Sequence, residues 1–233
     1  MGATWSGERV SVGRAVRQAA TDFYFNSLRF VPANVLFALG VLAVLFAASL
    51  WPPLIVLTVA LAAPLAGIHR MAALLARGEA ASIGDFVDGA RRFGLRATAI
   101  AALLAIVVAV LTTNVVTGFE SGGPIGWFLG ATALWGLVAV AMFAIAFWPV
   151  LVDPRHEAAP LRRRVQLAGL VLIGRPGRLF LVTLAIAAIL VGATVLLGAI
   201  VLVGVSFSSL LATRWVLPSV DELESRFEAA RAR

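Results

Sequence analysis

The chain has 233 residues, of which 61% are apolar and only 13% are charged. Soluble globular domains carry about a quarter charged residues, so a water-soluble core is excluded as the main organisation. The formal charge is +7, every basic residue is arginine, and cysteine is absent, which excludes disulfides, thiol catalysis and Cys-based zinc sites. The arginines flank apolar segments, so their acidic partner is expected to be anionic lipid headgroups and not nucleic acid.

Residues 1–29 are predicted to form an N-terminal segment at the cytoplasmic interface. Apolar or small residues recur at helical spacing from Val12 to Phe23, with charged residues between them. This pattern predicts an amphipathic helix at about 10–24. A cleavable signal peptide is not expected, because the first apolar run begins near Phe30 and is too long for one.

Residues 30–217 are predicted to form the membrane domain, an all-α polytopic transmembrane helical bundle. An apolar helix of about 20 residues crosses the hydrocarbon core of about 30 Å, and the chain contains about six such runs. The predicted spans lie at about 30–50, 54–76, 97–117, 127–152, 179–196 and 199–216. Residues 218–233 are predicted to be a polar cytoplasmic tail.

The second span and the connector after it contain the clearest local signals of the first half. Pro64 should kink the span, while His69 and Arg70 are interpreted as its emergence into water. An amphipathic interfacial helix is predicted at 83–94, with Ser82 and Asp85 as a weak capping box.

On the polar face of this connector helix, Asp88 and Arg92 are spaced as an i,i+4 pair. Asp85 and Asp88 could also be an acid–base pair, but a solvated helix face is the favoured interpretation.

The second half is similar to the first. His156 and Glu157 lie in a linker that we interpret as solvated, an interfacial helix is predicted at 161–173, and the glycine- and proline-containing residues 174–178 should end it. The span pairs flanking the two connectors are therefore expected to superpose. The turn between the last two spans is placed at about 196–199.

Arginine distribution predicts the orientation. The inferred external loops, near Trp51, Glu120 and Gly198, contain no arginine, so both termini are expected to be cytoplasmic in a bacterial inner membrane. Tryptophans are enriched at membrane interfaces. Those expected there are Trp51, Trp127, Trp148 and Trp215.

No ionisable residue is recognised inside a predicted span, where such a residue usually marks function. We therefore expect no catalytic, cofactor-binding or metal-binding residue and no enzymatic activity. Neutral polar residues such as Asn114 and Thr132 are interpreted as bonding helix to helix or to their own backbone. Glu79, Ala80 and Ala81 resemble the start of an ABC permease coupling loop, but Asp85 stands where that loop has glycine.

Three stretches resemble the YesL-like family, a bacterial membrane protein family of unknown function: FYFNSLRFVPANVLF (23–37), PLAGIHRMAALLARGE (64–79) and DFVDGARRF (85–93). Members are often encoded beside carbohydrate ABC transporters and polysaccharide-degrading enzymes, so the resemblance implies a helper role in sugar uptake or its regulation. The family pattern falls on Asn26, Arg29, Pro32, Asn34, Arg70, Gly78, Asp85 and Phe86.

The expected function is that of a non-catalytic accessory or regulatory partner of a bacterial carbohydrate uptake system, and the alternative is a small-solute transporter or permease subunit. The expected partners are anionic lipid and a membrane protein such as an ABC transporter subunit. The basic residues expected to face lipid or that partner are Arg91, Arg92, Arg162, Arg163 and Arg164.

Overall fold

The computed structural model describes residues 11–195 and 203–231, and within these stretches the fold is all-helical with no strand. Five helices are long and apolar enough to cross a membrane. They are Val12–Leu50, Pro52–Ala76, Ile83–Ser121, Gly123–Leu151 and Pro176–Ala193. The prediction of an all-α membrane protein with several spans is confirmed at this level.

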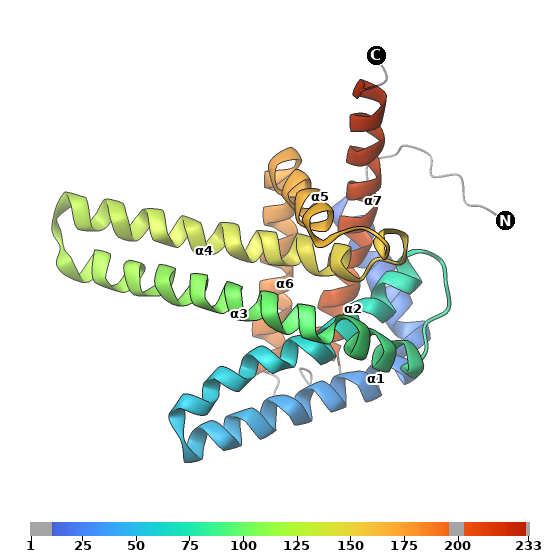
Figure 1. Cartoon of the computed structure of the whole chain (residues 1–233), viewed down its shortest axis with the longest axis horizontal. Helices are drawn as coiled ribbons and strands as arrows, with labels where there is room; N and C mark the ends of the chain where they lie inside the picture. Colours follow the sequence, from blue (N-terminus) through green and yellow to red (C-terminus); the bar gives the residue numbers. More distant parts are fainter. Residues whose placement is uncertain (1–10, 196–202, 232–233) are drawn as a thin grey trace.

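The helices form two long hairpins and a crossing pair (Figure 1). The first hairpin pairs α1 with η1 and α2, the second pairs α3 with α4, and α6 and α7 run across both. The elements are α1 (Val12–Leu50), the 3₁₀-helix η1 (Pro52–Leu61), α2 (Ala62–Ala76), α3 (Ile83–Ser121), α4 (Gly123–Val152), the 3₁₀-turn η2 (Pro154–His156), α5 (Leu161–Gly174), α6 (Pro176–Val195) and α7 (Val205–Arg231).

Helix α1 joins the predicted interfacial helix and the first span into one element with a kink. Asn26 has non-helical backbone angles, with φ of −116° and ψ of 15°. Its side-chain amide donates to the carbonyl of Asp22, one turn earlier, at 2.9 Å. The kink at Asn26 separates two helical segments of α1, which correspond to the helices expected at about 10–24 and 30–50.

The second span is irregular at its start. Pro52–Leu61 is a 3₁₀-helix, and the α-helix begins only at Ala62. Pro64 therefore lies in the first turn of α2, where a missing N–H is tolerated. The expected mid-helix kink at Pro64 is replaced by a change of helix type two residues earlier.

Helix α3 begins where predicted and continues further than predicted. Ser82 and Asp85 form a complete capping box, in which the backbone N–H of Ser82 donates to the Asp85 carboxylate at 2.8 Å. The helix then runs without a break to Ser121, so the interfacial helix expected at 83–94 and the span expected at 97–117 are one element. Helix α3 contains no proline, and the glycines within it do not end the helix.

Close contact between α2 and α3 depends on small residues. A Cβ atom at Gly67 would lie 2.8 Å from the Phe86 ring, and one at Gly89 would lie 2.7 Å from Cβ of Arg70. Phe86 is buried, as expected for a side chain that wedges the start of α3 against the spans. By contrast, α4 has little contact with α6, so the two span pairs expected to superpose are not packed alike.

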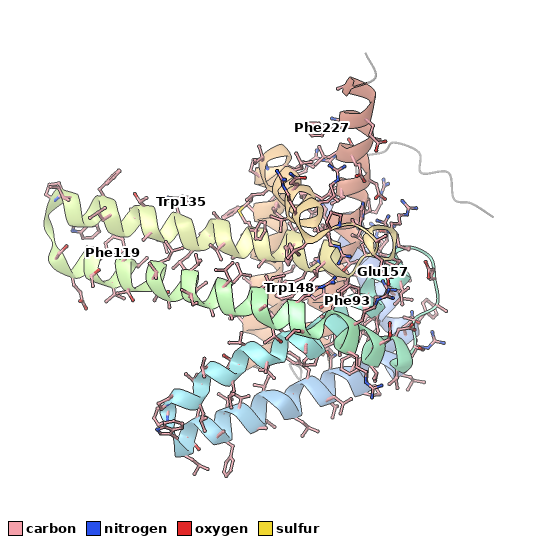
Figure 2. All side chains as sticks on the ribbon, viewed as in Figure 1. Phe93, Phe119, Trp135, Trp148, Glu157 and Phe227 are labelled. Atoms are coloured by element: carbon pink, nitrogen blue, oxygen red, sulfur yellow. The ribbon has the colours of Figure 1, made fainter. Side chains whose placement is uncertain are left out.

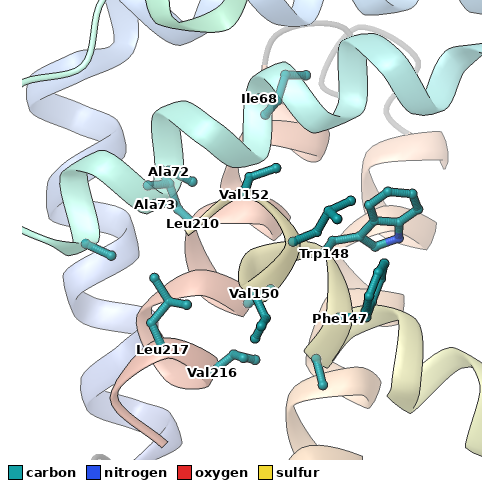
Figure 3. Close-up of a cluster of buried hydrophobic side chains, with 14 of the residues drawn as sticks. Ile68, Ala72, Ala73, Phe147, Trp148, Val150, Val152, Leu210, Val216 and Leu217 are labelled. Carbon is teal, nitrogen blue, oxygen red and sulfur yellow. The ribbon is translucent and has the colours of Figure 1, made fainter. Parts of the chain in front are cut away.

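The core lies where α2, α4 and α7 meet (Figure 3). Trp215 is fully buried and Trp148 is 9% exposed, whereas Trp51 and Trp127 are each 60% exposed. Only the last two are compatible with the expected membrane interface; Trp148 and Trp215 are core residues. The interface prediction failed for them because a span end next to a buried helix is covered by protein and not by lipid.

Helix α7 joins the described part of the expected sixth span to the expected tail, across Pro218. The first half of the helix is almost entirely buried, and it contacts α1, α2, α4, α5 and α6. The turn expected at 196–199 lies outside the described residues.

Candidate functional site

Charged side chains from four elements meet at one end of the bundle. The carboxylate of Asp153, before η2, accepts from the Nε of Arg77 at 3.0 Å. Arg77 lies just after α2 and also binds Asp221 of α7, whose Oδ1 lies 3.1 Å from an Arg77 terminal nitrogen. We use the name ionic cluster for Arg77, Asp153, His156, Asp221 and Glu224, with Arg155 and Arg163 at its edge.

Burial and pairing strengthen the Arg77 contacts. Arg77 and Asp153 side chains are 4% and 0% exposed. Burial alone would raise the pKa of Asp153, but hydrogen bonds from His156 and Arg77 outweigh it and hold that pKa at about 2. Burial opposes the charge of Arg77 too, yet bonds to Asp153 and Asp221 raise its pKa. Both groups are charged at neutral pH.

His156 lies inside this cluster and not in a solvated loop, which corrects the sequence interpretation. Its Nδ1 lies 2.9 Å from Asp153, its Nε2 lies 3.2 Å from Glu224, and its side chain is 11% exposed. The bond to Asp153 raises the pKa of His156, burial lowers it, and the bond to Glu224 raises it further, with a net increase. Arg163 also binds Glu224, at 2.6 Å.

Arg164 was expected to face lipid or a partner, and it is instead 1% exposed. Its guanidinium donates to the backbone carbonyls of Leu151, His156 and Glu157 at 2.6, 3.1 and 2.7 Å. Its Cζ lies 5.8 Å from the centre of the Phe93 ring. Because an arginine fork can satisfy several carbonyls at once, Arg164 fixes the linker between α4 and α5.

The other basic candidates differ in exposure. Arg91 and Arg162 are exposed, and their contact with lipid or a partner remains a prediction. Arg92 is also exposed, but it forms an ion pair with Glu157. Among the described residues no contact joins Arg92 to Asp88, so the expected i,i+4 pair is replaced by one between α3 and the linker.

Glu157 is therefore not a solvated linker residue. It also pairs with Arg70, whose NH2 nitrogen lies 3.1 Å from Oε2 of Glu157. Arg70 further donates to the Val152 carbonyl at 2.9 Å.

Two of the family-pattern positions, Arg29 and Asn34, connect α1 to the rest of the bundle. Arg29 donates to the Ala81 carbonyl at 2.8 Å and to the Asn26 side chain at 3.3 Å. The Oδ1 of Asn34 accepts from the hydroxyl of Ser206 in α7 at 2.8 Å. Pro32 lies inside α1, between these two contacts.

The remaining positions of the pattern shape the turn after α2. Gly78 has a φ of 81°, which favours glycine. Asp85 and Phe86 begin α3, as described above. Arg70, Gly78, Asp85 and Phe86 thus lie near one another along the α2–α3 connection, where each has a structural contact.

The sequence analysis did not predict that His69 is buried. This residue lies in the second candidate span and is 6% exposed, so it is a buried residue and not the point where the helix reaches water. Its Nε2 lies 3.5 Å from the Ser209 hydroxyl of α7. The serines and threonine that recur along one face of α7 were the available signal, because a buried polar face needs polar partners.

The α3–α4 hairpin carries a second set of polar residues. It is held closely by glycines: a Cβ atom at Gly118 would lie 2.6 Å from the backbone nitrogen of Gly130. A groove of about 550 Å³ follows the hairpin, and Asn114, Thr117 and Thr132 are among the residues that line it.

The threonines of this groove bond to carbonyls one turn earlier in their own helices. Within the described part of the chain, the exposed Asn114 amide has no hydrogen-bond partner.

The acidic residues of the ionic cluster pair with arginine side chains. No group of three or more histidine, aspartate or glutamate side chains among residues 11–195 and 203–231 could hold one. Comparisons with protein-family models, curated proteins and solved structures found no match to this chain. Functional inference therefore depends on the geometry above.

Proposed function

We propose that this chain is a non-catalytic integral membrane protein that acts by binding another membrane protein, and that the α3–α4 hairpin is the binding element. The observation that carries the proposal is the exposure of this hairpin. None of the residues in the most apolar stretch of α3 is buried within the chain. In Figure 2 the hairpin, with Phe119 and Trp135, extends well beyond the bundle.

The side-chain amide of Asn114 favours a protein partner over lipid at this surface. An amide in hydrocarbon has no water to bond, and such residues commonly bond across to a neighbouring transmembrane helix. The groove around Asn114 contains glycine and alanine at Gly118, Ala133 and Gly136. Gly118 and Gly136 allow α3 and α4 to pack closely against each other, and the groove follows this contact. The proposed occupant is a transmembrane helix with a polar side chain.

The ionic cluster supports an even number of crossings. Asp153 and His156 lie before α5, whereas Asp221 and Glu224 lie in α7. His156 contacts both Asp153 and Glu224, and Arg77 joins Asp153 to Asp221. The chain between these two groups must leave and return to one side of the membrane, or stay on it.

The same reasoning applies to α3 and α4, which are bracketed by the contact between Arg77 and Asp153. Together with the arginine distribution, this favours six spans with the ionic cluster and both termini on the cytoplasmic side of a bacterial inner membrane.

The partner's identity comes from the family resemblance alone. If the chain is a YesL-like protein, as its quoted stretches suggest, the partner is a subunit of a carbohydrate ABC transporter. The exposed Arg91 and Arg162 are proposed to bind anionic headgroups beside that complex. The alternative, a small-solute transporter, is favoured by one observation, the buried His69 within a span.

A photocrosslinking experiment tests the binding element. A benzophenone amino acid at Leu111, in the groove, should crosslink one partner protein in native membranes, and an Asn114→Leu substitution should reduce the yield about tenfold. Thr113→Val is the matched control, since the Thr113 hydroxyl bonds to Ala109 in its own helix.

Three outcomes contradict the proposal: crosslinks only to lipid, crosslinks only to a second copy of the chain, or an unchanged yield with Asn114→Leu. Solute uptake by proteoliposomes that contain only this protein would favour the transporter alternative.

A further inference from the structure

A cavity of about 330 Å³, partly open to the surface, lies where α1, α2, α4, α6 and α7 converge. Apolar side chains form most of its lining, among them Phe37 and Leu65 of the first hairpin and Ile186 of α6. Trp148 of α4 also lines it, and Figure 3 shows this indole at the edge of the buried core beside Phe147. The cavity is separate from the ionic cluster and from the hairpin groove, which have no lining residue in common with it.

Three of the residues that line this cavity have polar side chains, His69 from α2 and Ser208 and Ser209 from α7. His69 is 6% exposed and Ser208 is 8% exposed. Within the described residues, neither His69 Nδ1 nor the Ser208 hydroxyl has a hydrogen-bond partner. The remaining imidazole nitrogen lies 3.5 Å from the Ser209 hydroxyl, which is at the limit of a hydrogen bond.

Two residues that line one cavity each have an unpaired polar atom, which is costly unless something binds there. A buried donor or acceptor without a partner costs about 1–3 kcal/mol, and most such groups in native proteins are satisfied. A serine hydroxyl both donates and accepts, and a neutral imidazole has one nitrogen for each role. His69 and Ser208 together therefore match a single hydroxyl or carbonyl group.

We propose that this cavity is a binding site for a small neutral molecule with an apolar body and one hydroxyl or carbonyl group. Among the described residues no charged side chain lines the cavity, so an ionised ligand would be unpaired by them. An apolar cavity of about 150 Å³ accommodates benzene. This one has roughly twice that volume, which suits a molecule of two rings or a comparable aliphatic skeleton. The polar group lies between His69 and Ser208, and the apolar body lies against Phe37, Ile186 and Trp148.

Water is a poorer occupant. A buried water needs two to four polar partners, and the polar groups are confined to one side of the cavity. One water between His69 and Ser208 would leave most of the volume unfilled, against side chains that are mostly apolar. A lipid acyl chain fits the apolar part, but its terminal methyl group cannot satisfy the polar side.

The test uses 4-phenylphenol and biphenyl, which differ only in the hydroxyl group. Binding is measured by equilibrium dialysis against the purified full chain in phosphatidylcholine nanodiscs, with empty nanodiscs as background. We expect saturable binding of one 4-phenylphenol per chain, and about tenfold weaker binding of biphenyl. Ser208→Ala should weaken 4-phenylphenol binding to the level of biphenyl and leave biphenyl unchanged.

Two further variants separate the site from a general effect. Thr183→Val is the matched control, because the Thr183 hydroxyl bonds to Leu179 in its own helix and does not line the cavity. It should bind both probes as the wild type does. Ala212→Phe should fill the cavity and abolish saturable binding of both. Ser208→Ala removes no hydrogen bond found among the described residues, so it carries the test even if Ala212→Phe does not fold.

Several results would overturn the proposal. They are the absence of saturable binding above empty nanodiscs, equal affinity for the two probes, and 4-phenylphenol binding that Ser208→Ala leaves unchanged. A phospholipid that copurifies with the wild type and is lost from Ala212→Phe would assign the cavity to a lipid chain instead.

Discussion

Arg164 is expected to have a large effect on stability. It is buried among three backbone carbonyls, those of Leu151, His156 and Glu157, that have no water to replace it. Arg164→Met should lower the free energy of unfolding by about 3 kcal/mol or more, because each buried acceptor left unpaired costs ~1–3 kcal/mol. Arg164→Lys should recover only part of this, since an ammonium lacks the planar fork.

The control for Arg164 is Arg162→Met, two residues earlier on the exposed face of α5. It should change stability by no more than about 0.5 kcal/mol. Thermal unfolding of the purified variants in detergent, followed by near-UV circular dichroism, measures both. Equal destabilisation by the two substitutions would show that general loss of charge, and not the buried contacts, is responsible.

His156 should make stability depend on pH. Its contacts with Asp153 and Glu224 raise its pKa above the value of about 6.5 expected in the unfolded chain. A group of this kind contributes stability that is fully present below the unfolded pKa and is lost as pH rises through the folded pKa. The Tm difference between wild type and His156→Gln should therefore be larger at pH 6 than at pH 9.

Asp153 does not interfere with that measurement. Its pKa of about 2 means that its own contribution is lost only as pH falls through the strongly acidic range. A Tm difference that stays constant between pH 6 and 9 would indicate that His156 acts by packing alone.

At the scale of elements, the close packing of α3 against α4 requires glycine where the two helices touch. Gly118 is buried, and a Cβ atom there would meet the backbone of Gly130 at 2.6 Å. Gly118→Ala should separate the two helices and destabilise the protein by about 1–3 kcal/mol. In the α6 span, Gly192 has no atom within 4 Å of such a Cβ position. Gly192→Ala should be neutral or stabilising by up to about 1 kcal/mol, since alanine favours helix. Thermal unfolding compares the two, and an equal loss would exclude close packing as the cause.

The helices were largely predictable from the sequence, but the kinks and irregular turns that connect them were not. Apolar runs and the signals at Ser82 and at residues 174–178 correctly predicted where α3 begins and where α5 gives way to α6. The kink at Asn26 and the 3₁₀ start of the second span depend on local hydrogen bonds that hydropathy does not encode. Likewise, His156 and Arg164 look solvated in sequence because their partners Glu224 and Leu151 are brought to them by tertiary packing.

At the scale of the whole molecule, the ionic cluster relates the ends of the elements to one another. Arg214 of α7 binds Asp22 of α1 and the carbonyl of Leu75 at the end of α2. Arg77, Asp153 and Asp221 add the linker after α4. Through these contacts one end of each hairpin binds α7. The tips of the hairpins lie away from α7 (Figure 1). The tips and the ionic cluster therefore belong on opposite sides of the membrane if the hairpins span it.

The natural absence of cysteine makes this arrangement directly testable. Ser121→Cys lies at the tip of the α3–α4 hairpin, and Ser225→Cys lies in α7 one turn beyond Asp221; both serines are exposed and bond only within their own helices. In intact cells a membrane-impermeant maleimide should label Ser121→Cys and not Ser225→Cys, whereas both should react after permeabilisation. Ala158→Cys, in the linker that the ionic cluster holds beside α7, should behave like Ser225→Cys. Labelling of Ser225→Cys but not Ala158→Cys in intact cells would mean an odd number of crossings between them, which the direct contacts of His156 and Glu224 forbid. Five spans would then replace six, and the ionic cluster could not exist in the membrane-embedded protein.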